Sequence, residues 1–162
     1  MCQGCPRLQH LDVSFCLPLR SPEFVSDSLV VINASWCTAL TDSALLGLHR
    51  CSSLSHLLLC GCSSLSAPFL NVKTLQTVDL CSCTALLDVG VQHIINNCPA
   101  LEVLLLRKCD NLQDPLLLSE LATGKQPPLD ETNCPGHIDL RDCAQITGSY
   151  SQRQQGIVVL NV

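Results

Sequence analysis

The stretch that decides the fold reads Leu8-Gln-His-Leu11-Asp-Val13-Ser-Phe-Cys16, with a further leucine at Leu19. Its apolar residues follow the frame L-x-x-L-x-L-x-x-C-x-x-L. The alternation of apolar and polar residues from Leu11 to Val13 predicts a short strand with its apolar side chains on one face. The flanking leucines and the cysteine are expected to lie beneath the turns on either side of that strand.

The same frame returns along the chain at regular distances. Its closing cysteines are Cys16, Cys37, Cys62, Cys83, Cys109 and Cys143, which are 21, 25, 21, 26 and 34 residues apart. Residues Ile157 to Val162 match Leu29 to Ala34 position by position and supply the opening half of a seventh unit. Self-similarity at such a period is the sequence signature of a repeat architecture.

The repeat predicts an α/β leucine-rich-repeat solenoid, or horseshoe. One unit cannot bury its apolar face alone, so neighbouring units must stack. Parallel strands about 4.8 Å apart then form a concave sheet, with short helices or loops on the convex side. We expect a single domain over residues 1–162 with about six and a half repeats and a surface loop near residues 123–133. Both ends lack a polar capping unit, so the chain alone is expected to self-associate or to be only marginally stable.

Helix-start signals stand between several of the predicted strands. An acidic residue followed by proline at 114–115, the pair Thr41-Asp42, and Asp88 each offer an N-cap before an apolar run. Residues 21–23 start only a short helix. The two 21-residue units are too short for a full convex helix.

Composition excludes several classes of partner. Of the 162 residues 47% are hydrophobic, but only 3% are aromatic and 14% charged, and the formal net charge is −5. An acidic balance argues against nucleic-acid binding. The uncharged stretch 51–72 is interrupted by serines, a glycine, a proline and a histidine, so it is not a membrane span. Because the N-terminus resembles no secretory signal, we expect a cytoplasmic or nuclear location.

Thirteen cysteines occur, an odd number, and most hold fixed places in the repeat. Besides the closing cysteines, Cys5, Cys51, Cys98 and, more loosely, Cys134 open a unit. A buried free cysteine behaves as a small hydrophobe with a weak donor, so we expect reduced thiols that face the core. The pairs Cys2/Cys5, Cys60/Cys62 and Cys81/Cys83 suggest zinc as an alternative. A structural zinc site usually combines two converging ligand pairs. Here Cys62 and Cys83 are expected to point inward and no histidine joins Cys60 and Cys81, so we expect neither metal nor cofactor.

The units resemble the cysteine-containing leucine-rich repeats of F-box proteins, the substrate receptors of SCF-type ubiquitin ligases. The stretches that carry this resemblance are Cys51-Ser-Ser-Leu-Ser-His-Leu-Leu-Leu-Cys-Gly-Cys62, Cys98-Pro-Ala-Leu-Glu-Val-Leu-Leu-Leu-Arg-Lys-Cys109 and Cys37-Thr-Ala-Leu-Thr-Asp42. The resemblance implies substrate recognition for such a ligase, whose components would be contacted through sequence outside this chain. A repeat scaffold or inhibitor unconnected with ubiquitin is the alternative, because the same repeats occur without an F-box. A zinc-binding protein is a third reading.

No catalytic motif accompanies the repeats. Phosphate-binding loops, glycine fingerprints, nucleophile elbows and H-E-x-x-H are all missing from the sequence. His10, His56 and His137 share one column of the predicted sheet but belong to the first, third and sixth units, too far apart for a common site. We therefore expect a binding protein and not an enzyme.

The concave face is the expected site for a protein partner. Its predicted contact residues are His10, Asp12, Phe15, Asn33, Trp36, His56, Asp79, Arg107, Lys108, Asp139 and Arg141. Exposed aromatics such as Phe15 and Trp36 are favoured interface anchors, unless they pack under a neighbouring loop. Arg107, Lys108 and Arg141 suggest a seat for a carboxylate or phosphate, unless they form only a solvated face.

Overall fold

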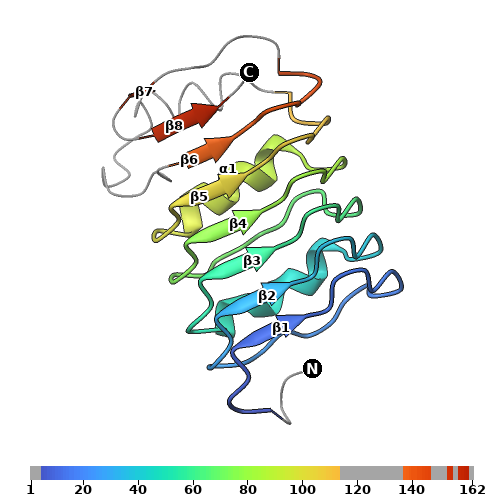
Figure 1. Ribbon diagram of the computed structural model, residues 1–162, viewed down its shortest axis with the longest axis vertical. Coiled ribbons are helices and arrows are strands. Elements are labelled where there is room, and N and C mark those ends of the chain that lie inside the picture. Colours follow the sequence, from blue (N-terminus) through green and yellow to red (C-terminus); the bar gives the residue numbers. More distant parts are fainter. Residues whose placement is uncertain (1–4, 114–136, 147–152, 155–156, 161–162) are drawn as a thin grey trace.

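A computed structural model describes residues 5–113, 137–146, 153–154 and 157–160 of the chain. Its strands are β1 (His10–Asp12), β2 (Val31–Asn33), β3 (His56–Leu58), β4 (Thr77–Asp79), β5 (Val103–Leu105), β6 (His137–Asp139), β7 (Arg153–Gln154) and β8 (Ile157–Leu160). Strands β1 to β6 are parallel and lie side by side in chain order (Figure 1). The described part of the chain is an α/β structure with one sheet and few helices.

The register of the sheet follows the repeat frame through its first six strands. The apolar centres of these strands form one row, Leu11, Ile32, Leu57, Val78, Leu104 and Ile138. In β2 to β5 the central side chain is buried and its two neighbours are half-exposed. The predicted alternation of inward and outward residues is thereby confirmed for these strands.

The seventh unit differs from its prediction by one residue. Strand β8 is parallel to β6 as expected, but Ile138 lies opposite Val159, whereas the match with residues 29–34 places Leu160 there. Strand β7, which the sequence did not predict, pairs with β8 in antiparallel fashion. Because β8 has a neighbour on each side, its register is not set by the repeat alone.

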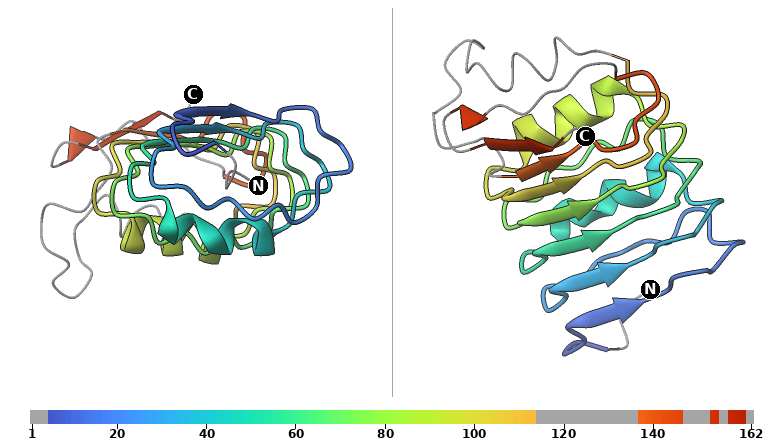
Figure 2. Two further views of the ribbon diagram at one scale, coloured as in Figure 1. Left: turned by 90° about the horizontal axis from the view of Figure 1, so that it is seen from below. Right: turned by 45° about the horizontal axis from the view of Figure 1, so that its top comes forward.

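Within the described residues, helices lie on the side opposite the sheet and occur in the 25- and 26-residue units (Figure 2). The 25-residue unit contains the 3₁₀ helix η1 (Asp42–Arg50) and the 26-residue unit contains α1 (Asp88–Asn97). Both 21-residue units cross by loops, as predicted. The short helix expected at residues 21–23 is wrong, because that segment has no helical turn. None of the helices in the described part has the length and apolar character that a membrane span requires.

The helix starts are set by contacts between layers. Helix α1 begins at Asp88, with Leu87 and not Asp88 in the N-cap position. The Asp88 carboxylate instead accepts a hydrogen bond from the backbone N–H of Gln113, one layer further on. Likewise Asp42 accepts hydrogen bonds from the N–H and hydroxyl groups of Ser66. These carboxylates tie successive units together in addition to favouring the positive end of their own helix.

The core runs through the stack between the sheet and the crossing segments. From the second layer on, its leucines, isoleucines, valines and closing cysteines are almost fully buried. Leu8, Leu11, Val13 and Leu19 of the first layer are only partly buried. Each layer is therefore covered by its neighbours, and the first layer is covered on one side alone among the described residues.

Several predictions fall outside the described residues. They are the helix start at 114–115, the loop near 123–133, and the thiols of Cys2 and Cys134.

Candidate functional site

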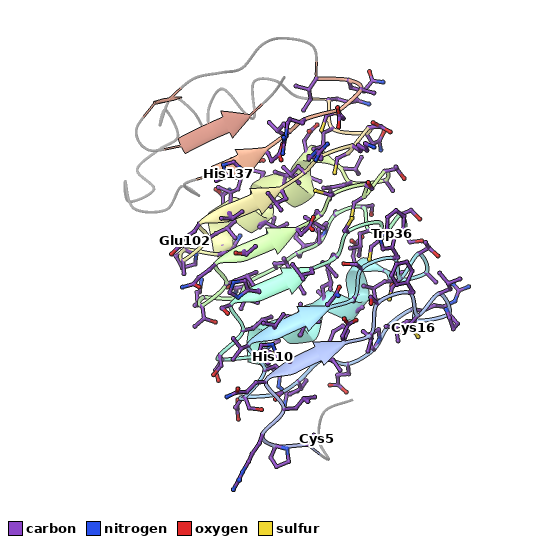
Figure 3. The ribbon with its side chains drawn as sticks, in the orientation of Figure 1. Cys5, His10, Cys16, Trp36, Glu102 and His137 are labelled. Atoms are coloured by element: carbon purple, nitrogen blue, oxygen red, sulfur yellow. The ribbon has the colours of Figure 1, made fainter. Side chains whose placement is uncertain are left out.

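The outward side chains of β1 to β6, together with the turns that follow these strands, form what we name the sheet face. Of the eleven predicted contact residues, His10, Asp12, Phe15, Trp36 and Lys108 are exposed, while Asn33, His56, Asp79, Arg107 and Arg141 are half-buried. Asp139 is the exception at 2% exposure. Trp36 and Cys16 lie beyond the carboxyl ends of the strands, and His10 and His137 lie at the other ends (Figure 3).

A left-handed turn precedes each closing cysteine. The residues with positive φ are Phe15 (58°), Trp36 (62°), Gly61 (72°), Ser82 (58°), Lys108 (57°) and Asp142 (62°). Every one of them stands immediately before the closing cysteine of its unit. The repeat thus imposes this backbone conformation at six equivalent positions, although only one of them is occupied by glycine.

Phe15 and Trp36 occupy this turn at an energetic disadvantage. A left-handed conformation costs a non-glycine residue about 1 kcal/mol or more, and bulky side chains are rare there. The two rings nevertheless stack, with centroids 6.3 Å apart and planes inclined by 8°. Phe15 is 68% exposed and Trp36 43%. No loop in the described part buries them, which favours the interpretation as surface groups.

Gly61 makes room for the Trp36 ring. A Cβ atom at position 61 would lie 2.5 Å from Cε3 and 2.6 Å from Cδ2 of Trp36. Because no real Cβ contact is that short, any residue larger than glycine would displace the indole. We name the arrangement of Phe15, Trp36 and Gly61 the aromatic shelf.

A fixed carboxylate, that of Asp12, lies in the same layer as Phe15. Asp12 accepts a 2.8 Å hydrogen bond from the backbone N–H of Ser14 and a 3.0 Å hydrogen bond from Nδ2 of Asn33. Hydrogen bonding by Ser14, and less by Asn33, lowers the pKa of Asp12. Asn33, Asp79 and Asp139 make the same contact with the backbone N–H two residues later. The carboxylate of Asp12 is therefore ionised, oriented and exposed.

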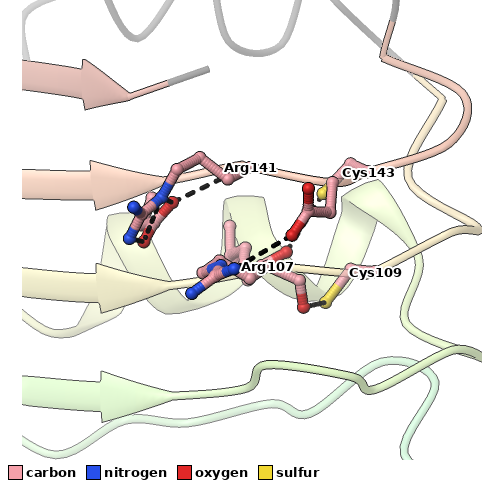
Figure 4. Close-up of polar contacts among 7 residues, drawn as sticks. Arg107, Cys109, Arg141 and Cys143 are labelled. Atoms are coloured by element: carbon pink, nitrogen blue, oxygen red, sulfur yellow. Dashed lines mark hydrogen bonds and ion pairs between the residues drawn. The ribbon is translucent and has the colours of Figure 1, made fainter. Parts of the chain in front are cut away.

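In the predicted anion site at Arg107, Lys108 and Arg141, both arginines are paired with acidic side chains of the chain itself. Arg107 forms a 3.0 Å ion pair with Asp142, and Arg141 forms one of 2.6 Å with Asp139 (Figure 4). Burial alone would raise the pKa of Asp139, but hydrogen bonds and charge from Arg141 outweigh it and lower that pKa. The expectation that Asp139 lies on the open face is wrong, since it lies buried against Arg141. Both guanidinium groups already bind carboxylates of this chain.

Closing cysteines form a ladder of thiol hydrogen bonds to the preceding layer. The pairs of donor Sγ and acceptor oxygen are Cys37 with Val13 (3.1 Å), Cys62 with Ala34 (3.2 Å), Cys83 with Leu59 (3.3 Å), Cys109 with Leu80 (3.1 Å) and Cys143 with Leu106 (3.1 Å). Burial raises the pKa of these thiols, that of Cys62 to about 12. The prediction of inward thiols is confirmed for these five and wrong for Cys5 and Cys16, which are exposed.

The remaining thiols on the sheet face are those of Cys60 and Cys81, which lie in the turns after the adjacent strands β3 and β4 and are half-buried. Burial first, and then Asp79, raise the pKa of Cys81 to about 12. None of the eleven described cysteines takes part in a disulfide. No three His, Cys, Asp or Glu side chains are grouped to hold a metal ion within the part of the chain that is described.

Comparison with known proteins agrees with the repeat. The chain is 32% identical over 121 residues to F-box/LRR-repeat protein 4 of Bos taurus, covering 67% of this chain and 19% of the relative. It is 29% identical over 109 residues to F-box/LRR-repeat protein 13 of Arabidopsis thaliana, covering 66% of this chain and 20% of that relative. The chain contains a leucine-rich-repeat-like region. No family model matches it, and it spans about a fifth of the length of the curated relatives it matches.

Sequence reasoning identified the aromatic pair but missed what holds it. The left-handed turn before each closing cysteine was not predicted, nor was the role of Gly61. A signal was present, because glycine stands immediately before Cys62 in the position that Trp36 holds before Cys37. A single glycine among six equivalent positions indicates that the turn accepts φ values that glycine tolerates best.

Proposed function

We propose that the chain is a leucine-rich-repeat solenoid whose sheet face binds another protein, and that it acts by binding and not by catalysis. The observation that carries this proposal is the pair of exposed, stacked aromatic rings held in strained turns on that face. The turn itself recurs in all six units, so the feature that distinguishes this part of the face is the aromatic side chain that each of the first two units places there. Exposed aromatics are also the residue type that most often anchors protein interfaces.

We propose further that the bound protein is a substrate of an SCF-type ubiquitin ligase, recognised in the cytoplasm or nucleus. The names of the two relatives support this reading, because both are F-box/LRR-repeat proteins. An interaction scaffold or inhibitor unconnected with ubiquitin is the competing proposal. Both use the sheet face in the same way and differ in what else the protein assembles with.

Site-specific photo-crosslinking tests the binding face. Thr77 lies at an outward position of β4, and Val89 lies exposed on α1, on the opposite side of the structure. A benzophenone amino acid at position 77 should crosslink a cellular protein that the same group at position 89 does not reach. Crosslinking from position 89 alone would place the binding site on the helical side and overturn the proposal.

The ligase proposal needs a separate measurement. Affinity purification of the tagged protein from cells, followed by mass spectrometry, should recover a cullin and its adaptor besides the crosslinked partner. Recovery of that partner without any ligase component would favour the scaffold or inhibitor.

A further inference from the structure

The charges of the sheet face are segregated along the stack. Through the first four layers, segments 9–15, 30–36, 55–61 and 76–82 contain the carboxylates of Asp12 and Asp79 and no lysine or arginine. Basic residues of the face begin at Arg107, in the fifth layer, where Arg107 and Arg141 are paired with acids. The aromatic shelf therefore lies in the part of the face that favours a positively charged ligand.

We propose that the aromatic shelf binds an arginine side chain of the partner, with the guanidinium on the rings of Phe15 and Trp36 and its charge directed towards Asp12. This inference rests on the proposed protein-binding function and names the chemistry of the bound protein. A cation over an aromatic face is attracted by the ring quadrupole, most strongly by tryptophan. The planar, weakly hydrated guanidinium also stacks on rings and matches the two oxygens of a carboxylate.

The geometry of the shelf suits a flat cation. The indole lies against Gly61, the two rings are nearly parallel, and Phe15 is 68% and Trp36 43% exposed. Asp12 stands three residues before Phe15 in the same layer, and Asn33 holds its carboxylate from the next layer. Two hydrogen bonds hold the carboxylate and stacking holds the rings, and such preorganisation favours affinity.

A glycine substitution in the left-handed turn can test binding without destabilising the fold. Glycine accepts the left-handed conformation without steric penalty, as it does at position 61. Phe15→Gly should therefore leave the melting temperature unchanged or higher while it removes half of the shelf. Ser82→Gly makes the same change in the same turn of the fourth layer and is the matched control.

The experiment uses Trp36 as its reporter, since it is the only tryptophan of the chain. The intact chain is titrated with the peptide acetyl-Gly-Gly-Arg-Gly-Gly-amide, and separately with the same peptide carrying glutamine. Tryptophan emission should change saturably with the arginine peptide, and the glutamine peptide should bind about three- to tenfold more weakly. Asp12→Asn and 0.5 M salt should each weaken the binding of the arginine peptide. Phe15→Gly should abolish the saturable change in emission, whereas Ser82→Gly should leave that change as it is in the wild-type protein.

The inference would be overturned if both peptides bound equally well. It would also be overturned if neither Asp12→Asn nor salt changed the affinity for the arginine peptide. Melting curves of each variant verify that it folds, and the salt series needs no variant at all. If position 77 still crosslinks a partner while the arginine peptide fails, only this inference is lost. If position 77 crosslinks nothing, the proposed function itself fails.

Discussion

The Sγ atom of Cys83 lies 3.3 Å from the backbone oxygen of Leu59, one layer earlier, and donates its hydrogen to it. The same contact recurs at each closing cysteine from Cys37 to Cys143. A thiol is small enough to fit between two layers, and its weak donor directs it to the carbonyl group of the layer before. The repeated cysteine therefore fixes the spacing between units as well as filling the core.

Cys83→Ala should lower the free energy of unfolding by roughly 1–2 kcal/mol, because it removes buried volume and a weak hydrogen bond together. Cys16→Ala, at the equivalent but exposed position, should change it by less than about 0.5 kcal/mol. Urea denaturation followed by circular dichroism measures both. Equal losses for the two variants would contradict a structural role for the thiol ladder.

The repeat frame predicted the sheet because one residue spacing determined both strand positions and register. Leu11, Ile32, Leu57, Val78 and Leu104 share a row because each unit repeats the same distance from its strand to its closing cysteine. The frame failed in the seventh unit, where β7 adds a second neighbour to β8. The repeat pattern describes only the pairing of equivalent residues in successive units. It could not predict that β7, a segment outside the repeat, pairs with β8.

The candidate site was predicted in part. The outward position of Asp12 follows from strand alternation. Phe15 and Trp36 are exposed as the variable positions of the repeat frame predict, but they lie in a left-handed turn that alternation does not describe. Ion pairs depend on which long side chains meet across layers, and no spacing rule separates Arg141 with Asp139 from a solvated pair. The expected exposure of Asp139 failed for that reason, whereas the anion seat at Arg107, Lys108 and Arg141 stays a prediction.

Native-state alkylation at pH 8 should separate the thiols by their position in the ladder. Cys16 is exposed, whereas Cys62 is buried with its pKa raised to about 12, so little of its thiolate forms or reaches the reagent. Mass spectrometry after brief iodoacetamide treatment should find Cys16 modified at least 100-fold faster than Cys62. In denaturant the two rates should converge. Comparable native rates would show that the layers are not closed around Cys62.

The pair of Asp139 and Arg141 should make stability depend on acidity. The native pKa of Asp139 is lowered below its usual 3.8, so its contribution is complete above that value and is lost as pH falls through the native pKa. Asp139→Asn should lower the free energy of unfolding by about 1–2 kcal/mol at pH 7. The loss is smaller than for a fully buried ion pair because Arg141 stays partly exposed. Asp142→Asn, in the exposed pair with Arg107, is the control and should have little effect.

Melting temperatures measured from pH 7 down to pH 2 check this prediction. The difference between the wild-type protein and Asp139→Asn should be constant down to about pH 4 and should shrink below it. A difference that grows on acidification would mean that the lowered pKa of Asp139 has been misassigned.

The partly buried apolar residues of the first layer lead to a prediction about self-association. Leu8 and Leu11 lie at one end of the core, where the described residues cover them on one side only, and β1 is the edge strand of the sheet. An open edge with apolar side chains favours pairing with a similar edge. The 162-residue chain should therefore show a mass that rises with concentration in sedimentation equilibrium.

Leu8→Lys with Leu11→Lys should weaken this association by placing charge on the open end of the core, whereas Gln9→Lys, on the exposed surface of the same layer, should not. A wild-type chain that stays monomeric at all concentrations would contradict an adhesive edge at β1.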